Sequence, residues 1–430
     1  MLETTSGADG EVPHRAGFID IIADLSVIRG PSPVFETLNR LSDDAILGVM
    51  AKYREDPSPL KIDLGVGVYR DAEGHTPVLE CVRTAERRIV AAQVTKAYVA
   101  PAGREEFNAA VVDLVLGREH RAVGERRVIA VQTPGGCGAL RVGAELLRAA
   151  APDASIHVSD PTWANHLPLL GGAGLRLQRY PYYEAAARRL AFDAMIERLE
   201  RAPTGDVVLL HGCCHNPTGA DLDADQWRTV ADLVSRRGLL PYLDLAYQGF
   251  GADLDADAQG VRLIASRVPE CLIATSFSKN LGLYRERVGA LLAVGASEAR
   301  AAAVRSHVLQ IARSIYSMPP DHGAAIAVEI FTDPALRRTW IAELATMRER
   351  VQAMRRLLAD ALRRLGGDGD YDYFERQRGM FSLLGAPPAV VERLREEFHV
   401  YMTADGRMNL AGLAPSSVER LAQAILRATR

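Results

Sequence analysis

The chain has 430 residues, of which 48% are hydrophobic and 24% are charged, and its formal net charge is −3. This length is enough for a large core and for two or three domains. The balanced charge excludes a polyelectrolyte, so we expect no nucleic acid and no membrane as partners. No apolar run approaches the length of a membrane span, and the five cysteines lack paired metal spacing. A reducing, cytoplasmic location is predicted.

The first part of the chain is predicted to be an N-terminal extension, residues 1–32, rich in small and charged residues. Within it, residues 18–22 are compatible with a short docking helix. A helix is predicted to start at Asp43 and Asp44, and residues 61–64 read as a strand that runs into a glycine-containing segment.

From about residue 125, short β-branched or leucine-rich runs alternate with helical stretches. One such stretch, residues 227–236, is entered from Asp223 and closed by Gly238. This alternation predicts an α/β fold with a mainly parallel, helix-covered sheet, in which ligands bind at the carboxyl ends of the strands. The predicted strands are residues 128–131, 156–159, 207–211, 239–245, 272–276 and 288–294.

After about residue 300 the sequence becomes helix-rich, with leucine, alanine and arginine periodicity through residues 341–365. A shorter mixed region follows. We predict a large domain over residues 77–346 and a smaller α/β domain that combines residues 33–76 with residues 347–430.

A lysine stands just beyond one predicted strand, in Ser276-Phe277-Ser278-Lys279-Asn280. A lysine in this position is ordinarily solvated, because its ammonium reaches water at a strand end. The alternative is a catalytic amine, and the neighbouring strand ends decide between the two.

The turn Gly135-Gly136-Cys137 opens a predicted helix, so its amides and the helix dipole are able to hold a phosphate. A plain tight turn has the same composition. Trp163 follows the next strand and suits either the core or stacking on a flat ring. The segment from His211 to Gly219 contains two adjacent cysteines, but their spacing does not suit a tetrahedral zinc site, and no metal is predicted.

Asp244 ends an apolar strand, where a buried carboxylate needs a cationic partner. A protonated ring nitrogen meets this need, with Tyr247 close behind. Lys279 as a Schiff-base nucleophile and Arg287 as a phosphate clamp complete a set that is typical of pyridoxal 5′-phosphate chemistry.

The order of these motifs resembles that of the aspartate and aromatic amino acid aminotransferases, a class I family of fold-type-I pyridoxal phosphate enzymes. The resemblance extends from about Pro33 to the C-terminus. The motifs that carry it are residues 65–70, residues 135–141, residues 211–219, residues 244–250, residues 276–280 and Gly406-Arg407.

The resemblance implies a role for each matching residue. Lys279 binds the cofactor covalently and moves the substrate proton, with Asp244 on the pyridine nitrogen and His166 behind it. Asn216 and Tyr247 bond the phenolic oxygen of the cofactor, and Trp163 stacks on its ring. The phosphate is held by Gly135, Gly136, Cys137, Ser276, Arg287 and Tyr98 of a neighbouring subunit in a homodimer.

The substrate-binding residues implied by the same resemblance are Gly67, Trp163, Asn216, Arg407 and Arg313. Arg407 pairs with the α-carboxylate, and Arg313 reaches across the dimer to a distal carboxylate.

Three residues depart from the family pattern. Cys137 stands where Thr or Ser is common, so a weak thiol donor replaces a hydroxyl. Met318 replaces a small polar residue near the substrate, and Ala97 replaces an Asn of the aspartate enzymes.

The function predicted from this resemblance is ping-pong transfer of an amino group from an aromatic or acidic L-amino acid to 2-oxoglutarate. The alternatives are another pyridoxal phosphate reaction, such as that of a lyase, decarboxylase or oxidase, and a non-catalytic cofactor-binding regulator.

Overall fold

The computed structural model describes residues 34–40, 45–366 and 369–430, and these residues form two units. The first unit, Met1–Asp43, contributes one described element, the 3-10 helix η1 (Val34–Thr37). The second unit, Asp44–Arg430, holds all the other described elements. The predicted extension over residues 1–32 and its short helix lie outside the described residues.

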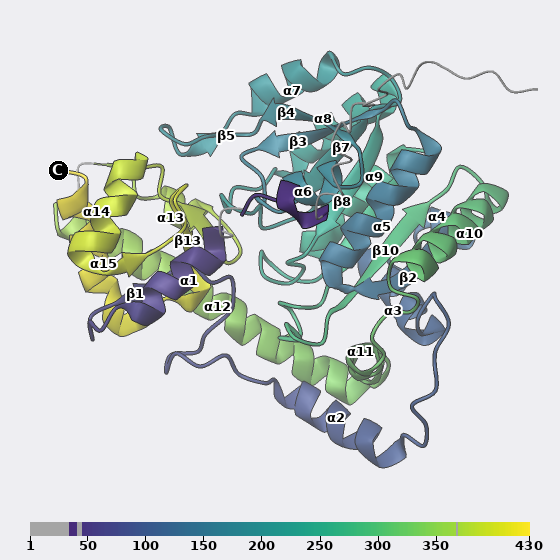
Figure 1. The fold of residues 1–430 in the computed structure, drawn as a ribbon, viewed down its shortest axis with the longest axis horizontal. Helices are drawn as coiled ribbons and strands as arrows, with labels where there is room; N and C mark the ends of the chain where they lie inside the picture. The colour runs from purple at the N-terminus through teal and green to yellow at the C-terminus, as the bar shows by residue number, and fades with distance from the viewer. Residues whose placement is uncertain (1–33, 41–44, 367–368) are drawn as a thin grey trace, which may run out of the picture. The chain divides into compact units, whose positions relative to one another are not determined.

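The centre of the second unit is a seven-stranded sheet in the order β2-β10-β9-β8-β7-β3-β4 (Figure 1). Strand β10 runs antiparallel to both of its neighbours, and the remaining pairs are parallel, so the predicted fold class is confirmed. Its strands are β2 (Val128–Pro134), β3 (Ser155–Asp160), β4 (Arg176–Pro181), β7 (Val207–His211), β8 (Leu240–Leu245), β9 (Cys271–Ser276) and β10 (Val288–Val294).

Six of these strands are the predicted ones, and β4 is an addition. Its sequence, RLQRYP, contains two arginines and no apolar run, and the strand lies at the edge of the sheet. Edge strands expose one side to water and tolerate charged residues, which removes the apolar signal.

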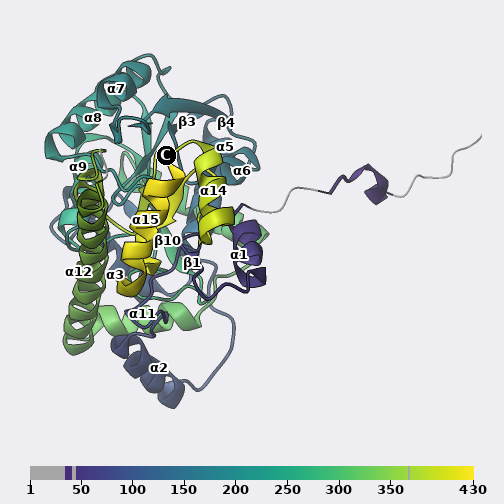
Figure 2. The same ribbon diagram turned by 90° about the vertical axis from the view of Figure 1, so that its left-hand side faces the viewer.

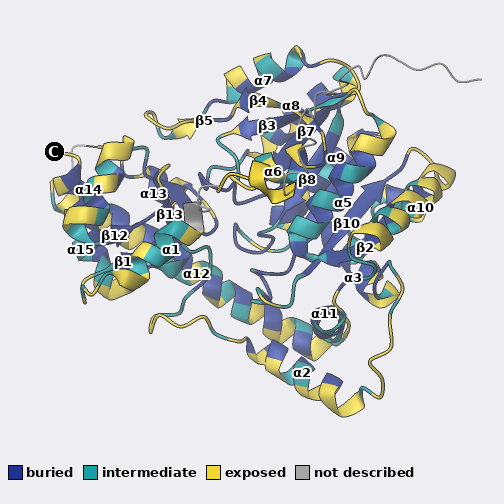
Figure 3. Cartoon of the chain, viewed as in Figure 1, coloured by how far each residue is buried: buried dark blue, intermediate teal, exposed yellow. Residues whose placement is uncertain are grey.

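Helices cover both faces of the sheet, because alternate residues of each strand enter different cores. In β9, Ile273 packs into one core and Leu272 into the other. One core includes residues of α7 (Phe192–Glu200), α8 (Ala224–Arg237) and α9 (Gln259–Arg267). The other includes residues of α5 (Gly135–Ala150), α6 (His166–Gly171) and α10 (Glu298–Ile315). Figure 3 shows the buried sheet and the exposed outer faces of the helices.

Helix α8 shows how local sequence sets the ends of these helices. The Asp223 side chain accepts from the backbone N–H of Gln226, and the Gln226 side chain accepts from the Asp223 N–H. At the other end, Gly238 adopts a left-handed conformation with φ of 61°. The predicted flanking residues Asp223 and Gly238 are confirmed, and the helix is longer than the predicted residues 227–236 at both ends.

A third core lies around the second half of α12 (Pro334–Arg364), which Figure 2 shows running past α15 (Val418–Ala428). Chain segments far apart in sequence meet there: Ile62 and Leu64 pack with residues 354–428. The domain boundaries at residues 76 and 346 stay a prediction. The elements of this region are α1 (Ala45–Glu55), β1 (Ile62–Asp63), α13 (Tyr373–Arg376), β11 (Phe381–Leu383), α14 (Pro388–Phe398), β12 (Val400–Tyr401), β13 (Arg407–Asn409), η3 (Leu410–Gly412) and η4 (Pro415–Ser417).

Two short pairings in this region position the site. Strand β1 pairs in parallel with β12, and β11 pairs antiparallel with β13, which sets Leu383 opposite Arg407. The remaining elements are α2 (Glu80–Ala92), α3 (Glu105–Val115), α4 (Arg121–Gly124), β5 (Tyr183–Glu184), β6 (Arg189–Leu190), η2 (Ala256–Ala258) and α11 (His322–Thr332). Among the residues that the structure describes, no helix is long and apolar enough to cross a membrane.

Candidate active site

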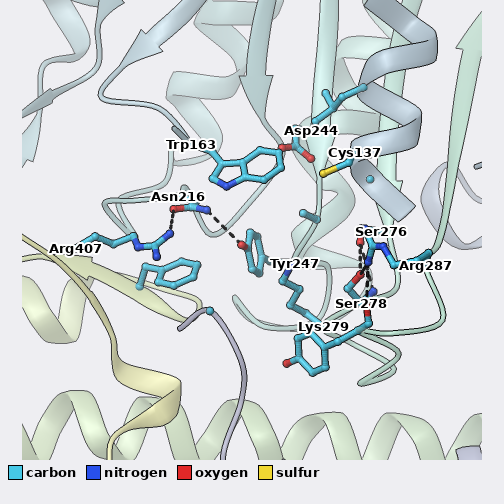
Figure 4. Close-up of a pocket in the computed structure, with 16 residues that line it drawn as sticks. Cys137, Trp163, Asn216, Asp244, Tyr247, Ser276, Ser278, Lys279, Arg287 and Arg407 are labelled. Atoms are coloured by element: carbon cyan, nitrogen blue, oxygen red, sulfur yellow. Dashed lines mark hydrogen bonds between the residues drawn. The ribbon is translucent and has the colours of Figure 1, made fainter. Parts of the chain in front are cut away.

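A cavity of about 290 Å³ lies at the carboxyl ends of β8 and β9, where ligands of parallel sheets bind (Figure 4). Eleven of the residues predicted from the sequence line it: Gly67, Gly136, Cys137, Trp163, Asn216, Asp244, Tyr247, Ser276, Lys279, Arg287 and Arg407. Five further residues complete the lining: Leu140, Ala246, Ser278, Tyr284 and Phe381.

Lys279 enters the cavity three residues after β9 ends, and its Nζ lies 5.5 Å from the centroid of the Tyr247 ring. Burial lowers the pKa of Lys279, and it outweighs the attraction of Asp244 for the charged amine. A larger share of neutral amine follows, which is the form that acts as a nucleophile or base.

Asp244 is the next-to-last residue of β8 and only 7% exposed. Burial alone raises the pKa of this carboxyl, but the hydrogen bond and the charge of His166 outweigh it, so the pKa is lowered. His166 Nε2 lies 3.2 Å from Asp244 Oδ2, and its Nδ1 lies 2.8 Å from Thr162 Oγ1. Asp244 therefore presents a fixed negative charge to the cavity, with His166 behind it and outside the lining.

A cup of hydrogen-bond donors is formed where α5 starts beside the chain between β9 and β10. The first amides of this 16-residue helix have no partner in the helix. Arg287 donates to Ser278 Oγ at 3.2 Å, and Ser276 Oγ lies 3.2 Å from Ser278 Oγ. Gly135 has φ of 70°, and a Cβ there would stand 2.5 Å from Arg287 Nη2. The glycine thus allows the guanidinium to approach the helix start.

Cys137 lies in this cup and is half-buried. Burial raises the pKa of the Cys137 thiol in spite of the positive charges of Arg287 and Lys279. Asn165 Nδ2 lies 3.8 Å from its sulfur. The group is therefore a neutral thiol, a weaker hydrogen-bond donor than a hydroxyl.

The opposite wall of the cavity carries a second cation, Arg407 (Figure 4). Its Nη2 donates to the Gly65 carbonyl at 2.9 Å, and its Nη1 lies 3.5 Å from Asn216 Oδ1. Asn216 in turn donates to the Tyr247 hydroxyl at 3.4 Å. The Phe381 ring lies 4.5 Å from the Arg407 guanidinium carbon. A fixed, mostly buried guanidinium of this kind suits a carboxylate.

Trp163 lines the cavity with its ring edge-on to His166, at 5.2 Å between centroids and 81° between planes. The indole is thus supported from behind while it remains half-exposed on the cavity side. Such a surface is able to stack on a flat ring.

Four predicted site residues do not line this cavity: Gly135, His166, Tyr98 and Arg313. The first two lie directly behind lining residues, as described above. Tyr98 is 94% exposed, and Arg313 is exposed and donates to Ser317 Oγ. Met318, predicted to lie near the substrate, is not among the lining residues of its own chain either.

The sequence interpretation missed Ser278, Tyr284 and Phe381 as site residues. Ser278 directly precedes Lys279 in the lysine motif, so the sequence alone could have predicted its hydroxyl as part of the site. Tyr284 accepts from the Tyr69 N–H at 3.0 Å, and Phe381 comes from β11. Tyr284 and Phe381 reach the cavity through the packing of segments that are distant in sequence, so no local sequence pattern predicts their position.

Two cysteines of the loop from His211 to Gly219 lie close to Asp257 of η2, and none of the three lines the cavity. The sulfurs of Cys213 and Cys214 and a carboxylate oxygen of Asp257 lie within 4.8 Å of one another. The oxygens of Asp257 accept from the N–H groups of Gly249, Gly251 and Ala252. The five cysteines are free, and the absence of a metal stays a prediction.

Comparison with known proteins places the site in context. The family model for aminotransferase class I and II matches residues 59–425. The chain is 47% identical to an aromatic-amino-acid aminotransferase of Paracoccus denitrificans, over 89% of this chain and 96% of that protein. It is 43% identical to an aspartate aminotransferase of Escherichia coli, over 91% of this chain and 99% of that protein.

Solved structures give the same picture. A crystal structure of an aromatic-amino-acid aminotransferase from Burkholderia pseudomallei, covalently bound to pyridoxal phosphate, superposes with a TM-score of 0.90. The identity is 40%, and the match covers 93% of this chain and 100% of that chain. An aspartate aminotransferase from the cytoplasm of Saccharomyces cerevisiae also gives a TM-score of 0.90, at 36% identity, over 92% of this chain and 98% of that chain.

Proposed function

The chain belongs to the aminotransferase class I and II family, and we propose that it moves the amino group of an aromatic or acidic L-amino acid to 2-oxoglutarate with pyridoxal 5′-phosphate. The observation that carries this proposal is the convergence of Lys279, Asp244 and the Arg287 cup on one cavity. An amine, a carboxylate and an anion site match the three chemically different ends of this cofactor.

The residues present fit the cofactor. The α5 amides, Ser276, Ser278 and Arg287 form a donor set suited to a phosphate dianion. The buried carboxylate of Asp244 suits a cationic ring nitrogen, and Trp163 suits the ring face. Bound pyridoxal phosphate supplies an aldehyde that condenses with amines and a ring that withdraws electrons from the attached carbon.

Lys279 carries out the proton transfer in this proposal. Its lowered pKa supplies a neutral amine, which removes the proton from the substrate Cα and returns a proton in the later half of the exchange. Asp244 keeps its charge because His166 stabilises the ionised carboxylate. Tyr247 and Asn216 lie between the lysine and Arg407: the Asn216 amide donates to the Tyr247 hydroxyl, and the Asn216 carbonyl oxygen accepts from Arg407.

The substrate carboxylate pairs with Arg407, whose guanidinium is held by the Gly65 carbonyl and the Phe381 ring. A distal carboxylate requires a second cation, and Arg313 is too exposed to serve the cavity of its own chain. We infer that the enzyme is a homodimer in which Arg313 and Tyr98 enter the site of the other copy.

Exposed apolar side chains near Tyr98 and Arg313 in the sequence support the dimer. Val90 and Val94 are exposed on the same segment as Tyr98, and Ile315 is exposed beside Arg313. Exposed apolar side chains that lie together in one patch mark an interaction site, and we propose that these side chains form such a patch in the dimer. Sedimentation analysis is expected to give a dimer mass. The cytoplasmic location stays a proposal and is open to cell fractionation.

A substrate panel tests the reaction. Each amino acid is incubated with the cofactor-loaded enzyme, first alone and then with 2-oxoglutarate, and the oxo acid product is identified. A transaminase stops after one equivalent without 2-oxoglutarate and turns over with it. Continuous turnover without an oxo acid would instead identify a lyase, decarboxylase or oxidase, and no turnover at all would favour a cofactor-binding regulator.

The attachment of the cofactor is tested on a small set of lysines. The chain contains four, Lys52, Lys61, Lys96 and Lys279. Borohydride reduction of the loaded enzyme followed by peptide mass spectrometry is expected to locate the adduct on Lys279 alone. Lys61, whose Nζ donates to the carbonyls of Tyr53 and Asp56, is the matched control. An adduct that persists in Lys279→Ala would overturn the assignment.

A further inference from the structure

Arg355 is a charged side chain buried in the second half of α12, only 1% exposed. Burial lowers its pKa to about 10. Within residues 34–40, 45–366 and 369–430, it forms no ion pair with a carboxylate within 4.0 Å. A buried guanidinium without a carboxylate partner is costly unless its N–H groups are bonded, so the bonds of Arg355 identify what it stabilises.

These bonds converge on one short segment that leads into β11. The acceptors are the Phe374 carbonyl at 3.0 Å, the Arg378 carbonyl at 3.2 Å, the Gly379 carbonyl at 2.8 Å, the Phe381 carbonyl at 2.6 Å and Ser382 Oγ at 2.7 Å. Arg355 therefore holds the backbone of β11 at its first residue, Phe381.

Phe381 is the link from this backbone to the cavity. Its ring packs against the guanidinium of Arg407 at 4.5 Å and edge-on to Tyr247 at 6.0 Å. The pairing of β11 with β13 sets Leu383 opposite Arg407, on the same side of the strand as Phe381. A shift of the Phe381 backbone thus moves the surface on which Arg407 rests.

The loop that carries Asn216 packs against the same backbone, at Phe381 and beside Arg355. Gly219 ends this loop with φ of 70°, and a Cβ there would stand 2.4 Å from the Phe381 carbonyl oxygen and 3.2 Å from Arg355 Nη2. The Arg378 N–H donates to the Gly219 carbonyl at 2.7 Å. Two of the supports of Arg407, the Phe381 ring and Asn216, are therefore anchored beside one buried cation.

We propose that Arg355 is a positioning residue for the carboxylate site: its guanidinium fixes Phe381 and the end of the Asn216 loop, and through them Arg407. This inference rests on the proposed function for the identity of the carboxylate as that of the substrate. The ligand class that it governs is any small molecule whose carboxylate pairs with Arg407.

The test measures carboxylate binding apart from turnover. The probe is 3-phenylpropionate, which has a carboxylate but no amine, titrated into the cofactor-loaded enzyme by calorimetry. In Arg355→Met the dissociation constant is expected to rise about 10-fold, the equivalent of about 1.4 kcal/mol. KM for amino acids rises similarly, whereas kcat and the visible absorbance of the bound cofactor stay close to wild type.

Two further variants separate positioning from simple stability. Arg355→Lys keeps a cation with three donors and is expected to recover most of the affinity. If Arg355→Met does not fold, Arg355→Gln, which keeps two donors but no charge, is expected to show the loss of affinity instead. Arg350 lies on the same helix and donates to the carbonyls of Asp71 and Leu413, outside the cavity. Arg350→Met is expected to lower the melting temperature without weakening the probe.

The double variant that combines Arg355→Met with Phe381→Ala tests whether the two residues act together. If Arg355 acts in part through Phe381, the loss of probe affinity in the double variant is smaller than the sum of the two single losses. Additive losses, an unchanged probe affinity in Arg355→Met, or an equal loss in Arg350→Met would overturn the inference. A loss of probe binding in an enzyme that turns over no amino acid would refute the proposed function and leave the positioning role intact.

Discussion

Replacement of Asp244 by Asn removes one negative charge and leaves the shape of the side chain unchanged. In the structure this carboxylate is 7% exposed and 3.2 Å from His166 Nε2. Its lowered pKa keeps it ionised at neutral pH. The proposed function gives this charge one task, which is to hold a cationic ring nitrogen in a site with little water.

The size of the effect follows from the burial of the pair. Removal of one partner from a buried ion pair costs about 3–5 kcal/mol, because the remaining charge is left uncompensated. If this loss falls on the transition state, the rate drops by about 10²–10⁴. The assay is the single-turnover rate of the first half-reaction, followed by the cofactor absorbance, with cofactor content measured separately.

Asp257→Asn is the matched control for this experiment. Asp257 is also buried, but its carboxylate accepts three backbone N–H groups away from the cavity. The control variant is expected to lose stability and to retain its half-reaction rate when folded. A rate in Asp244→Asn above about one tenth of wild type, or an equal loss in the control, would refute the reasoning.

Three other predictions follow from the same geometry. Arg407→Lys loses the bidentate fork, so KM for amino acids is expected to rise about 100-fold in steady-state assays; an unchanged KM would exclude the carboxylate role. His215 is buried and neutral, with a pKa well below 6.5, so stability to urea should fall as pH drops below about 6.5, by up to about 1.4 kcal/mol per pH unit. This dependence should flatten in His215→Gln, and an identical slope would assign it to other groups. Arg313→Ala should impair dicarboxylates far more than aromatic substrates. When the Arg313→Ala protein is mixed 1:1 with the inactive Lys279→Ala protein, dicarboxylate turnover should return to about a quarter of the wild-type value. About half of the dimers are then mixed, and one of the two sites in each mixed dimer has both Lys279 and Arg313. No recovery would exclude a site shared between copies.

Much of the large sheet was predictable because its strands are buried and its helices carry local end signals. Residues 207–210 and Val288–Val294 are continuous apolar runs, and Asp223 and Gly238 bound a helix by hydrogen bonds and backbone conformation within a few residues. The edge strand Arg176–Pro181 escaped prediction because its exposed side is charged.

The candidate site was likewise predictable where its residues follow strand ends in short motifs. Asp244 and Lys279 stand beside apolar runs, and Gly135 and Gly136 are the first residues of helix α5. The roles of the site residues stay predictions, and Tyr98 and Arg313 also lie outside the cavity of their own chain.

The sequence by itself determined the chemistry of this protein: an amine, a carboxylate and an anion cup at the ends of adjacent strands, in an order shared with a known family. Only the tertiary structure decided how Arg407 is held. Arg355 and Phe381 are 26 residues apart and belong to different elements, and their contact at 2.6 Å depends on how α12 packs against β11. Local patterns report hydrogen bonds and burial within an element, whereas such a contact arises only when distant elements share one core.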